Sequence, residues 1–285
     1  MAHLPSILAT ILFVASIVLV CPVFFNRARR AVLWRPRRFK RPGIHLAEGC
    51  VVMGIAFLYL ALSILESAWG KTDDAPPVLN MAALFFIALT TLAWAAPAVA
   101  VLLRESASLS NTFGIRWQTA WRDTRAGVRY GVMMIFPVAA TAWLTQVFFN
   151  VFGRPVEQQD ALVLLANTEA PVLLRAAFAV FCATLVSVCE EAAFRGVLLP
   201  ALNRWRGAEV SALAWLFKIP LARWHTALFL QAALFTLVHF NAMAAPALFC
   251  VGVFLGIGYA RTGSLLTPVA MHAVFNVQAV LWACA

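Results

Sequence analysis

The stretch from 171 to 199 reads PVLLRAAFAVFCATLVSVCEEAAFRGVLL, an apolar run with two adjacent glutamates and an arginine in its second half. A hydrocarbon core about 30 Å thick takes about 20 helical residues, because each adds about 1.5 Å and only a helix satisfies its own backbone hydrogen bonds in lipid. The stretch is long enough to cross such a core. It therefore predicts a membrane-spanning helix that carries charges inside the bilayer.

The rest of the chain is equally apolar. Hydrophobic residues make up 63% of the 285 residues and charged residues 12%, whereas soluble proteins use about 45–50% apolar residues. This composition excludes an ordinary soluble enzyme. We expect an all-α, polytopic membrane helix bundle of about eight transmembrane helices, at 4–25, 46–67, 78–103, 131–151, 171–199, 226–243, 247–260 and 265–284.

The basic residues predict the orientation of these helices. The linker 26–42 carries eight arginines and lysines and no acidic residue, which places it in the cytoplasm and the N-terminus outside. Alternation along the chain then puts 18 of the 22 basic residues on the inner side. The net charge of +10 lies between apolar runs rather than on one soluble face, so we expect a lipid bilayer and not nucleic acid as the partner.

We divide the chain at residue 170 according to what each part is expected to contain. Residues 1–170 are expected to form transmembrane helices 1–4 with basic cytoplasmic linkers, and residues 171–285 a catalytic core of helices 5–8. Within the first part, 115–130 combines tryptophans with four arginines, which indicates either a helix on the inner membrane surface or a solvated linker. The six cysteines have neither the spacing of a disulfide framework nor that of a zinc ribbon.

The charges in the fifth span are costly and therefore informative. A charge at the bilayer centre costs at least about 2.5–3.5 kcal/mol, so it needs a partner and usually has a purpose. Glu191 and Arg195 are four residues apart and share a helix face, whereas Glu190 points about 100° away. One carboxylate can pair with the arginine while the other faces a cavity. The alternative is an ion cluster that only holds helices together.

Two later spans each contribute a deep histidine. Phe235 and His239 are four apart in the sixth span, and His272 and Asn276 are four apart in the eighth. Polar side chains in lipid face the bundle interior and therefore one another. Depths counted at 1.5 Å per residue place Glu190, His239 and His272 about 12–20 Å from the inner boundary. We expect the three spans to share one site.

The chemistry of this set favours amide hydrolysis. Glu190 can accept a proton from water, while the imidazoles and the Asn276 amide donate to the developing oxyanion. Zinc bound by Glu190, His239 and His272 is the alternative, with an open position for water. The sequence lacks a His-Glu-x-x-His, Gly-x-Ser-x-Gly or Cys-x-x-Cys motif, and a thiol such as Cys189 in apolar surroundings is a poor nucleophile.

The ordered set Glu190-Glu191-x-x-x-Arg195, Phe235-x-x-x-His239 and His272-x-x-x-Asn276 resembles the CAAX-protease and bacteriocin-processing (CPBP, or Abi) family of intramembrane endopeptidases, over about 172–281. The resemblance implies that Glu190 is the catalytic base and that His239 binds or activates water. It also implies that His272 and Asn276 stabilise the oxyanion, with Glu191, Arg195 and Phe235 as supporting residues. For the cofactor, it favours a glutamic endopeptidase without metal over the zinc form.

The expected substrate is a membrane-embedded or membrane-anchored protein or peptide. The arginine-rich inner linkers suggest a bacterial inner membrane. Two other functions use the same residues. A transporter would employ them as a proton relay or ion site, although the first half of the chain has no counterpart to the charged cluster. A non-catalytic immunity or scaffold protein would keep them only for structure.

Overall fold

The computed structural model describes residues 4–26, 44–69, 79–105, 110, 113–154, 160–166, 170–205 and 223–284. These residues form helices and no strand. Six helices are long and apolar enough to cross a membrane, and two shorter apolar segments, Leu46–Leu58 and Trp224–Leu237, accompany them. The all-α polytopic bundle is confirmed. The basic linker 26–42 lies, apart from Asn26, outside the described residues, so the N-terminus-outside orientation stays a prediction.

Most predicted spans agree with the helices within a few residues, and the first agrees at both ends. One helix, α7, was not predicted. The bounds are α1 (Leu4–Phe25), α3 (Leu46–Trp69), α4 (Met81–Glu105), α6 (Trp117–Val151), α7 (Asp160–Ala166), α8 (Val172–Phe181), η1 (Cys182–Val186), α9 (Ser187–Glu191), η2 (Ala192–Leu198), α10 (Leu199–Arg204), α12 (Arg223–Leu237), α13 (Ala245–Thr262) and α14 (Leu266–Ala283).

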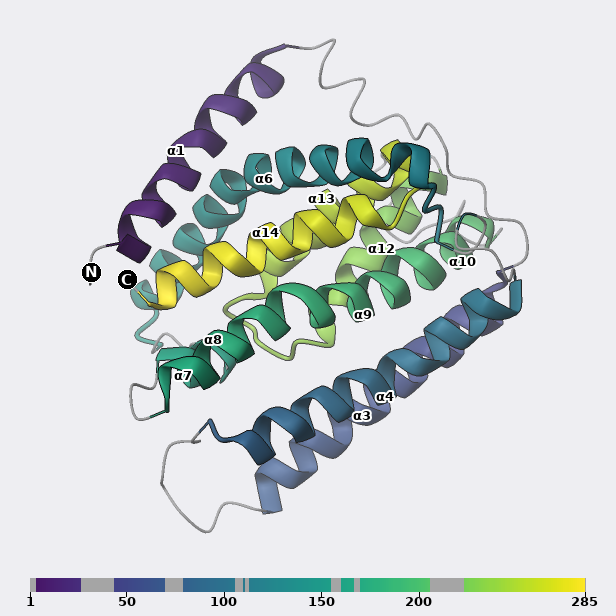
Figure 1. The fold of residues 1–285 in the computed structure, drawn as a ribbon, viewed down its shortest axis with the longest axis horizontal. Coiled ribbons are helices and arrows are strands. Elements are labelled where there is room, and N and C mark those ends of the chain that lie inside the picture. Colours follow the sequence, from purple (N-terminus) through teal and green to yellow (C-terminus); the bar gives the residue numbers. More distant parts are fainter. Residues whose placement is uncertain are drawn as a thin grey trace.

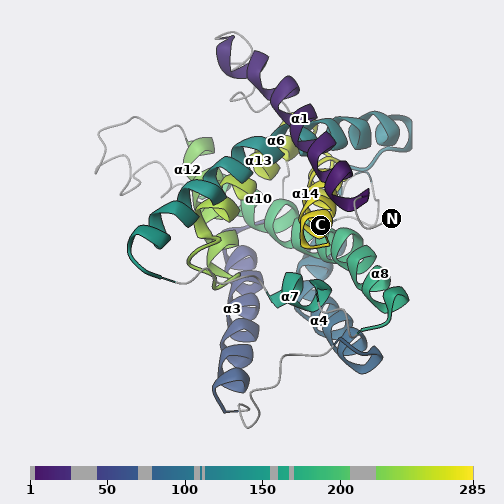
Figure 2. The same ribbon diagram turned by 90° about the vertical axis from the view of Figure 1, so that its left-hand side faces the viewer.

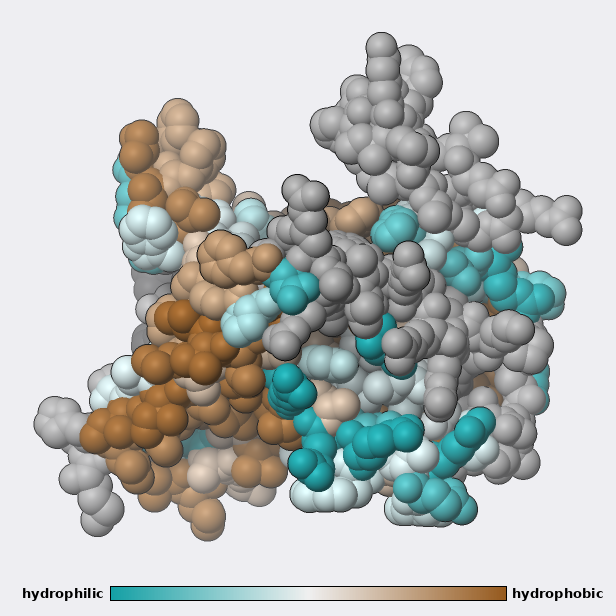
Figure 3. All heavy atoms as spheres, turned by 90° about the horizontal axis from the view of Figure 1, so that it is seen from above, coloured by the Kyte–Doolittle hydropathy of each residue, from teal (hydrophilic) through white to brown (hydrophobic). Residues whose placement is uncertain are grey.

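The fourth span begins earlier than predicted. Its helix α6 starts at Trp117 rather than residue 131 and has 35 residues, about 52 Å of helix. Of the two alternatives for 115–130, the linker was wrong and the helix is confirmed, since Gly127 packs against α14 and does not interrupt it. That this helix lies on the inner membrane surface stays a prediction. Trp117 is 80% exposed, so the basic first half of α6 keeps an open face. Figure 3 shows apolar residues gathered on one side of the molecule and hydrophilic ones on the other.

The sixth span ends earlier than predicted. Helix α12 stops at Leu237 and not at residue 243, although the residues beyond are mostly apolar. Phe240 adopts a φ of 45°, the left-handed region that ends a helix. The Asn241 side chain then accepts a hydrogen bond from the Ala244 amide at 2.8 Å, just before α13 begins. His239 therefore lies in a turn between α12 and α13.

The fifth span is one run of helix from Val172 to Arg204 with two wide turns in it. The π-helical segments η1 and η2 flank the short α-helical segment α9, which carries both glutamates. π-turns are rare and occur often at functional sites. The 3.6-residue pattern of a sequence does not reveal them, so the prediction contained a regular helix here.

The helices from both halves of the chain build one core. Helices α6 and α14 run side by side through the centre, and α1 packs against α6 (Figures 1 and 2). Helices α3 and α4 pack against the fifth span. Close approach depends on glycine: a Cβ at Gly127 would lie 2.4 Å from the Thr267 carbonyl oxygen, and one at Gly252 would lie 2.9 Å from Ala232. Because α6 from the first part packs against helices of the second, the two parts share one core. The division at residue 170 stays a prediction about which part carries the catalytic residues.

The contact between α6 and α14 gives a stability prediction. Gly127→Ala should destabilise the protein by about 1–3 kcal/mol, because the new methyl group meets the α14 backbone and Ala270. Gly54→Ala is the matched control, since nothing lies within 4 Å of its Cβ position and alanine favours a helix. Thermal unfolding in detergent measures both. Equal melting temperatures for the two variants would contradict the packing account.

Candidate active site

The two adjacent glutamates occupy different environments on α9. Glu191 is fully buried, whereas 14% of the Glu190 side chain is exposed. The Oε2 atoms of both glutamates accept no hydrogen bond from any residue that the structure describes, but Glu191 Oε1 is bound by Arg195 and His272. The prediction that one carboxylate pairs while the other stays free to react agrees with this geometry.

Arg195 neutralises Glu191. Its Nη1 donates to Glu191 Oε1 at 2.8 Å, which confirms the pair expected from the four-residue spacing. Its Nη2 donates to the Gly252 carbonyl of α13 at 3.2 Å, and its guanidinium lies 4.7 Å from the centre of the Phe235 ring. A cation over an aromatic face is attracted to it, most strongly where water is excluded. Arg195 thus has three kinds of contact in a place without solvent.

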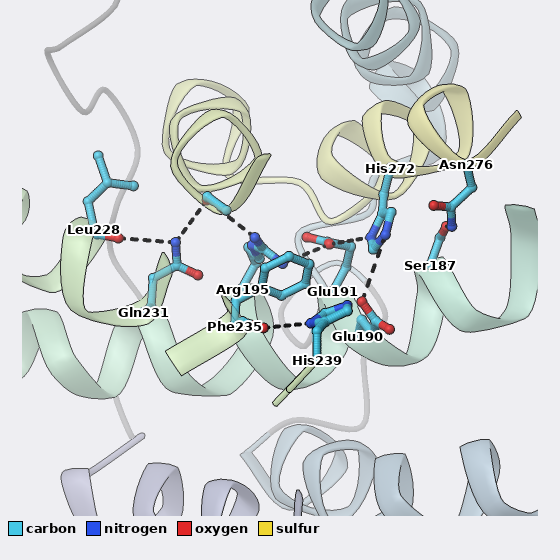
Figure 4. Close-up of polar contacts among 11 residues, drawn as sticks. Ser187, Glu190, Glu191, Arg195, Leu228, Gln231, Phe235, His239, His272 and Asn276 are labelled. Carbon is cyan, nitrogen blue, oxygen red and sulfur yellow. Dashed lines mark hydrogen bonds and ion pairs between the residues drawn. The ribbon is translucent and has the colours of Figure 1, made fainter. Parts of the chain in front are cut away.

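His272 lies between the two glutamates. Its Nδ1 is 2.9 Å from Glu191 Oε1, and because a carboxylate only accepts, Nδ1 carries the hydrogen. Its Nε2 lies 3.8 Å from Glu190 Oε2 (Figure 4). Glu191 therefore fixes the orientation of the ring, and the ring presents Nε2 to the reactive carboxylate.

His239 reaches the same place from the end of α12. Its Nδ1 is 2.7 Å from the Phe235 carbonyl oxygen, one of the carbonyls that a helix end leaves without an intrahelical partner. The capping bond turns the other ring nitrogen away from the helix, and Figure 4 shows the His239 side chain beside Glu190. Helix α12 ends before the predicted sixth span does, and this early end positions His239.

Phe235 has a larger role than its expected support of His239. Its ring centre lies 4.7 Å from that of His239 and 6.0 Å from that of His272. The same ring contacts Arg195 and is fully buried. Phe235 therefore holds both imidazoles at a fixed separation and covers the charged pair beneath them.

Asn276 is bound to the glutamate-bearing helix. Its Nδ2 donates to the Cys182 carbonyl at 2.8 Å and to Ser187 Oγ at 3.3 Å. Cys182 is the first residue of η1, and Ser187 the first of α9. The amide thus fixes the wide turn that precedes Glu190, while its role as an oxyanion donor stays a prediction.

Sequence reasoning missed two polar residues near the site, Gln231 and Ser187. Gln231 is fully buried and donates to the Gly252 carbonyl at 2.9 Å, the same oxygen that accepts from Arg195. Its signal was available, since a carboxamide in an apolar span also needs a partner inside the bundle. Ser187 offered no such signal, because a lone serine in a helix often bonds its own backbone.

The zinc alternative depends on three donors. Both histidines give Nδ1 to an acceptor, so each neutral ring has its Nε2 lone pair for water, a proton or a metal. A metal-bound histidine commonly donates its other nitrogen to a carboxylate, as His272 does to Glu191. Over the described ranges, however, no group of three or more histidine, cysteine and acidic side chains is arranged to hold a metal ion.

Comparison with known proteins finds one family match, over the part of the chain that carries the site. Residues 172–278 match the model of a family described as type II CAAX prenyl endopeptidase Rce1-like. The match confirms the resemblance drawn from the three motifs, and all seven motif residues fall within it. The family match and the apolar helices together identify the chain as an integral membrane protein. No curated protein and no solved structure matches the chain.

The buried pair can be tested by neutralising it in two steps. Arg195→Met alone leaves the Glu191 charge without its guanidinium and should cost about 3–5 kcal/mol of stability. Adding Glu191→Gln removes the stranded charge and keeps a partner for His272, so the double variant should recover most of the loss. Unfolding by denaturant in micelles measures each step. A double variant less stable than Arg195→Met would refute the pairing.

Proposed function

We propose that the chain is an intramembrane endopeptidase that hydrolyses a peptide bond of a membrane-associated protein or peptide. The proposal is supported by the match of residues 172–278 to the type II CAAX prenyl endopeptidase Rce1-like family model. The observation that carries the proposal is the position of His272, whose two ring nitrogens face Glu191 and Glu190. A structural ion cluster needs only Glu191 and Arg195. The second, partly exposed carboxylate and its facing imidazole are what a reaction requires.

The proposed first step uses Glu190 and His239. A water molecule gives one proton to the Glu190 carboxylate as its oxygen bonds to the carbonyl carbon of the substrate. His239 Nε2 accepts a hydrogen bond from the same water, since its Nδ1 hydrogen is engaged by Phe235. General-base catalysis of this kind contributes about 10²–10⁴-fold in rate. Glu190 then passes the proton to the departing amine as the carbon–nitrogen bond breaks.

His272 is assigned the oxyanion. With a hydrogen on both ring nitrogens it balances the charges of the cluster, because two carboxylates then face one guanidinium and one imidazolium. Its Nδ1 stays bound to Glu191 and its Nε2 hydrogen is directed to the carbonyl oxygen. A donor fixed before the reaction stabilises the developing charge without reorganisation.

Asn276 is assigned a second contact to the oxyanion. Its bond to Ser187 is the longer of the two that it makes, at 3.3 Å against 2.8 Å to Cys182. On substrate binding the amide exchanges this longer bond for the oxyanion and keeps the Cys182 bond that holds the helix. Catalytic hydrogen bonds are often loose before substrate arrives and tighten in the complex.

The proposal includes a substrate class and a location. The substrate is a polypeptide held at the membrane by its own apolar segment or by an anchor, because the site lies among helices that are long and apolar enough to cross a bilayer. The location is a bacterial inner membrane, supported by the many arginines of the inner linkers.

The assigned base gives the principal functional prediction. Glu190→Gln keeps the shape of the side chain but cannot take a proton, so cleavage should fall by at least about 10²-fold. Comparing the protein termini in membranes of cells with the wild type and with Glu190→Gln measures this and identifies the substrate. Glu48→Gln is the control, since Glu48 pairs with Arg104 at the end of α3. Equal sets of termini for wild type and Glu190→Gln would overturn the assignment.

The metal-free form is tested separately. Purified enzyme should keep its activity on the identified substrate after treatment with a chelator and dialysis, because a carboxylate and two imidazoles supply the base and the donor. Zinc content is measured in the same samples. Activity that is lost on chelation and returns with one zinc per chain would establish the zinc alternative at Glu190, His239 and His272.

A further inference from the structure

The first half of α6, from Trp117 to Tyr130, carries a basic surface that the proposed reaction does not use. The helix has 35 residues and is about 52 Å long, whereas a hydrocarbon core is about 30 Å thick. Counted back from the last residue, Val151, about 20 residues fill the core, which then ends near Gly131. The residues before Gly131 therefore reach the headgroup layer and the water beyond it.

One side of this half-helix is packed and the opposite side is open. The packed side faces α14, where the Thr267 hydroxyl donates to the Asp123 carbonyl at 3.0 Å and Gly127 lies against the Thr267 backbone. The open side combines tryptophans and arginines that are all exposed, namely Trp117, Trp121, Arg122, Arg125 and Arg129. At 100° per residue these side chains form one face about 140° wide, centred opposite Asp123 and Gly127.

This face carries positive charge that the described residues do not neutralise. Asp123 is the acidic residue of the segment, and its side chain is only 4% exposed. Its carboxylate accepts from Arg122 at 3.1 Å and from Thr119 at 2.8 Å, so it offsets the first of the three arginines. Arg125 and Arg129 form no ion pair with any acidic residue that the structure describes. Two guanidinium groups one helical turn apart are left for an anionic partner.

The depth of the face indicates which anion it meets. Arg129 and Arg125 lie about 3 and 9 Å from the end of the core at Gly131, which is the level of the lipid headgroups. Trp117 and Trp121 are 80% and 73% exposed. Tryptophan is enriched at the membrane interface, and arginine binds a phosphate through two parallel hydrogen bonds. An anionic phospholipid therefore matches the charge, the position and the aromatic rings of this face.

We propose that the exposed face of α6 between Trp117 and Arg129 binds the headgroups of anionic phospholipids. The guanidinium groups of Arg125 and Arg129 contact the phosphates, and the tryptophan rings lie between the headgroups. This interaction goes beyond the proposed endopeptidase function and does not depend on it. It attracts basic side chains to a negatively charged leaflet, an attraction that falls off within a Debye length of the surface.

Photo-crosslinking with two lipids tests the proposal. One probe is phosphatidylglycerol and the other phosphatidylcholine, each with a diazirine on the acyl chain next to the glycerol, so that only the headgroup differs. The protein is reconstituted in phosphatidylcholine nanodiscs that contain a small share of one probe, and mass spectrometry locates the labelled residues. Phosphatidylglycerol should label 117–130 about tenfold more than phosphatidylcholine does. Leu4 and Ile7, exposed at the start of α1 in a segment without arginine or lysine, should be labelled equally by both.

Matched variants show which side chains are responsible. Arg125→Gln and Arg129→Gln should each lower the labelling ratio at 117–130 about fivefold, and the double variant should bring it close to one. Replacing both arginines by lysine keeps the charge and should keep most of the preference. Arg154→Gln is the control, because Arg154 is exposed just beyond the other end of α6 and should not affect labelling at 117–130. Because these side chains are exposed, the variants should melt at the wild-type temperature.

The outcomes separate a lipid from other partners and from catalysis. Equal labelling of 117–130 by the two probes, or an unchanged ratio in the double glutamine variant, would overturn the inference. A soluble polyglutamate peptide with the same diazirine serves as the competing partner. If it labels 117–130 more strongly than phosphatidylglycerol does, the face belongs to an acidic protein and the lipid assignment is wrong. Each of these results leaves the role of Glu190 untouched, since cleavage is measured separately.

Discussion

The site depends on one constraint: a charge inside the bundle needs a partner, because low-dielectric surroundings give it no water. Arg195 meets this requirement for Glu191, and the Gly252 carbonyl and the Phe235 ring contact Arg195 in turn. Gln231 donates to the same Gly252 carbonyl. Glu191 in turn orients His272. The buried pair thus fixes an imidazole from a distant helix and leaves Glu190 as the carboxylate with room to react.

The backbone departs from regular helix where the site needs it. Two π-helical segments flank the glutamates, and Asn276 binds the carbonyl at the start of the first. Helix α12 ends early, and its last turn is capped by the His239 ring. Small residues let the helices approach: Gly252 brings α13 close to α12, so that its carbonyl meets both Arg195 and Gln231.

Composition and residue spacing were sufficient to predict the features that depend on local helix geometry. Apolar length predicted the helical bundle, and the four-residue spacing predicted the Glu191–Arg195 pair, because both depend on local helix geometry. The predicted start of α6 was wrong, since the helix continues through Gly127 and Gly131, which pack against α14. The predicted end of α12 was wrong, since a left-handed Phe240 and the Asn241 side chain end it within an apolar stretch. The bond from Asn276 to Cys182 joins residues 94 apart, and no local pattern carries that information.

The central claim is that Glu190 and His272 act on the same carbonyl group. The most direct test is an experimental structure of the protein with a peptide aldehyde, whose hydrate resembles the tetrahedral intermediate. The account predicts one hydrate oxygen about 3 Å from His272 Nε2, where an oxyanion donor belongs, and the other beside Glu190. A hydrate bound away from both residues, or an aldehyde carbon bonded to Cys189, would contradict it.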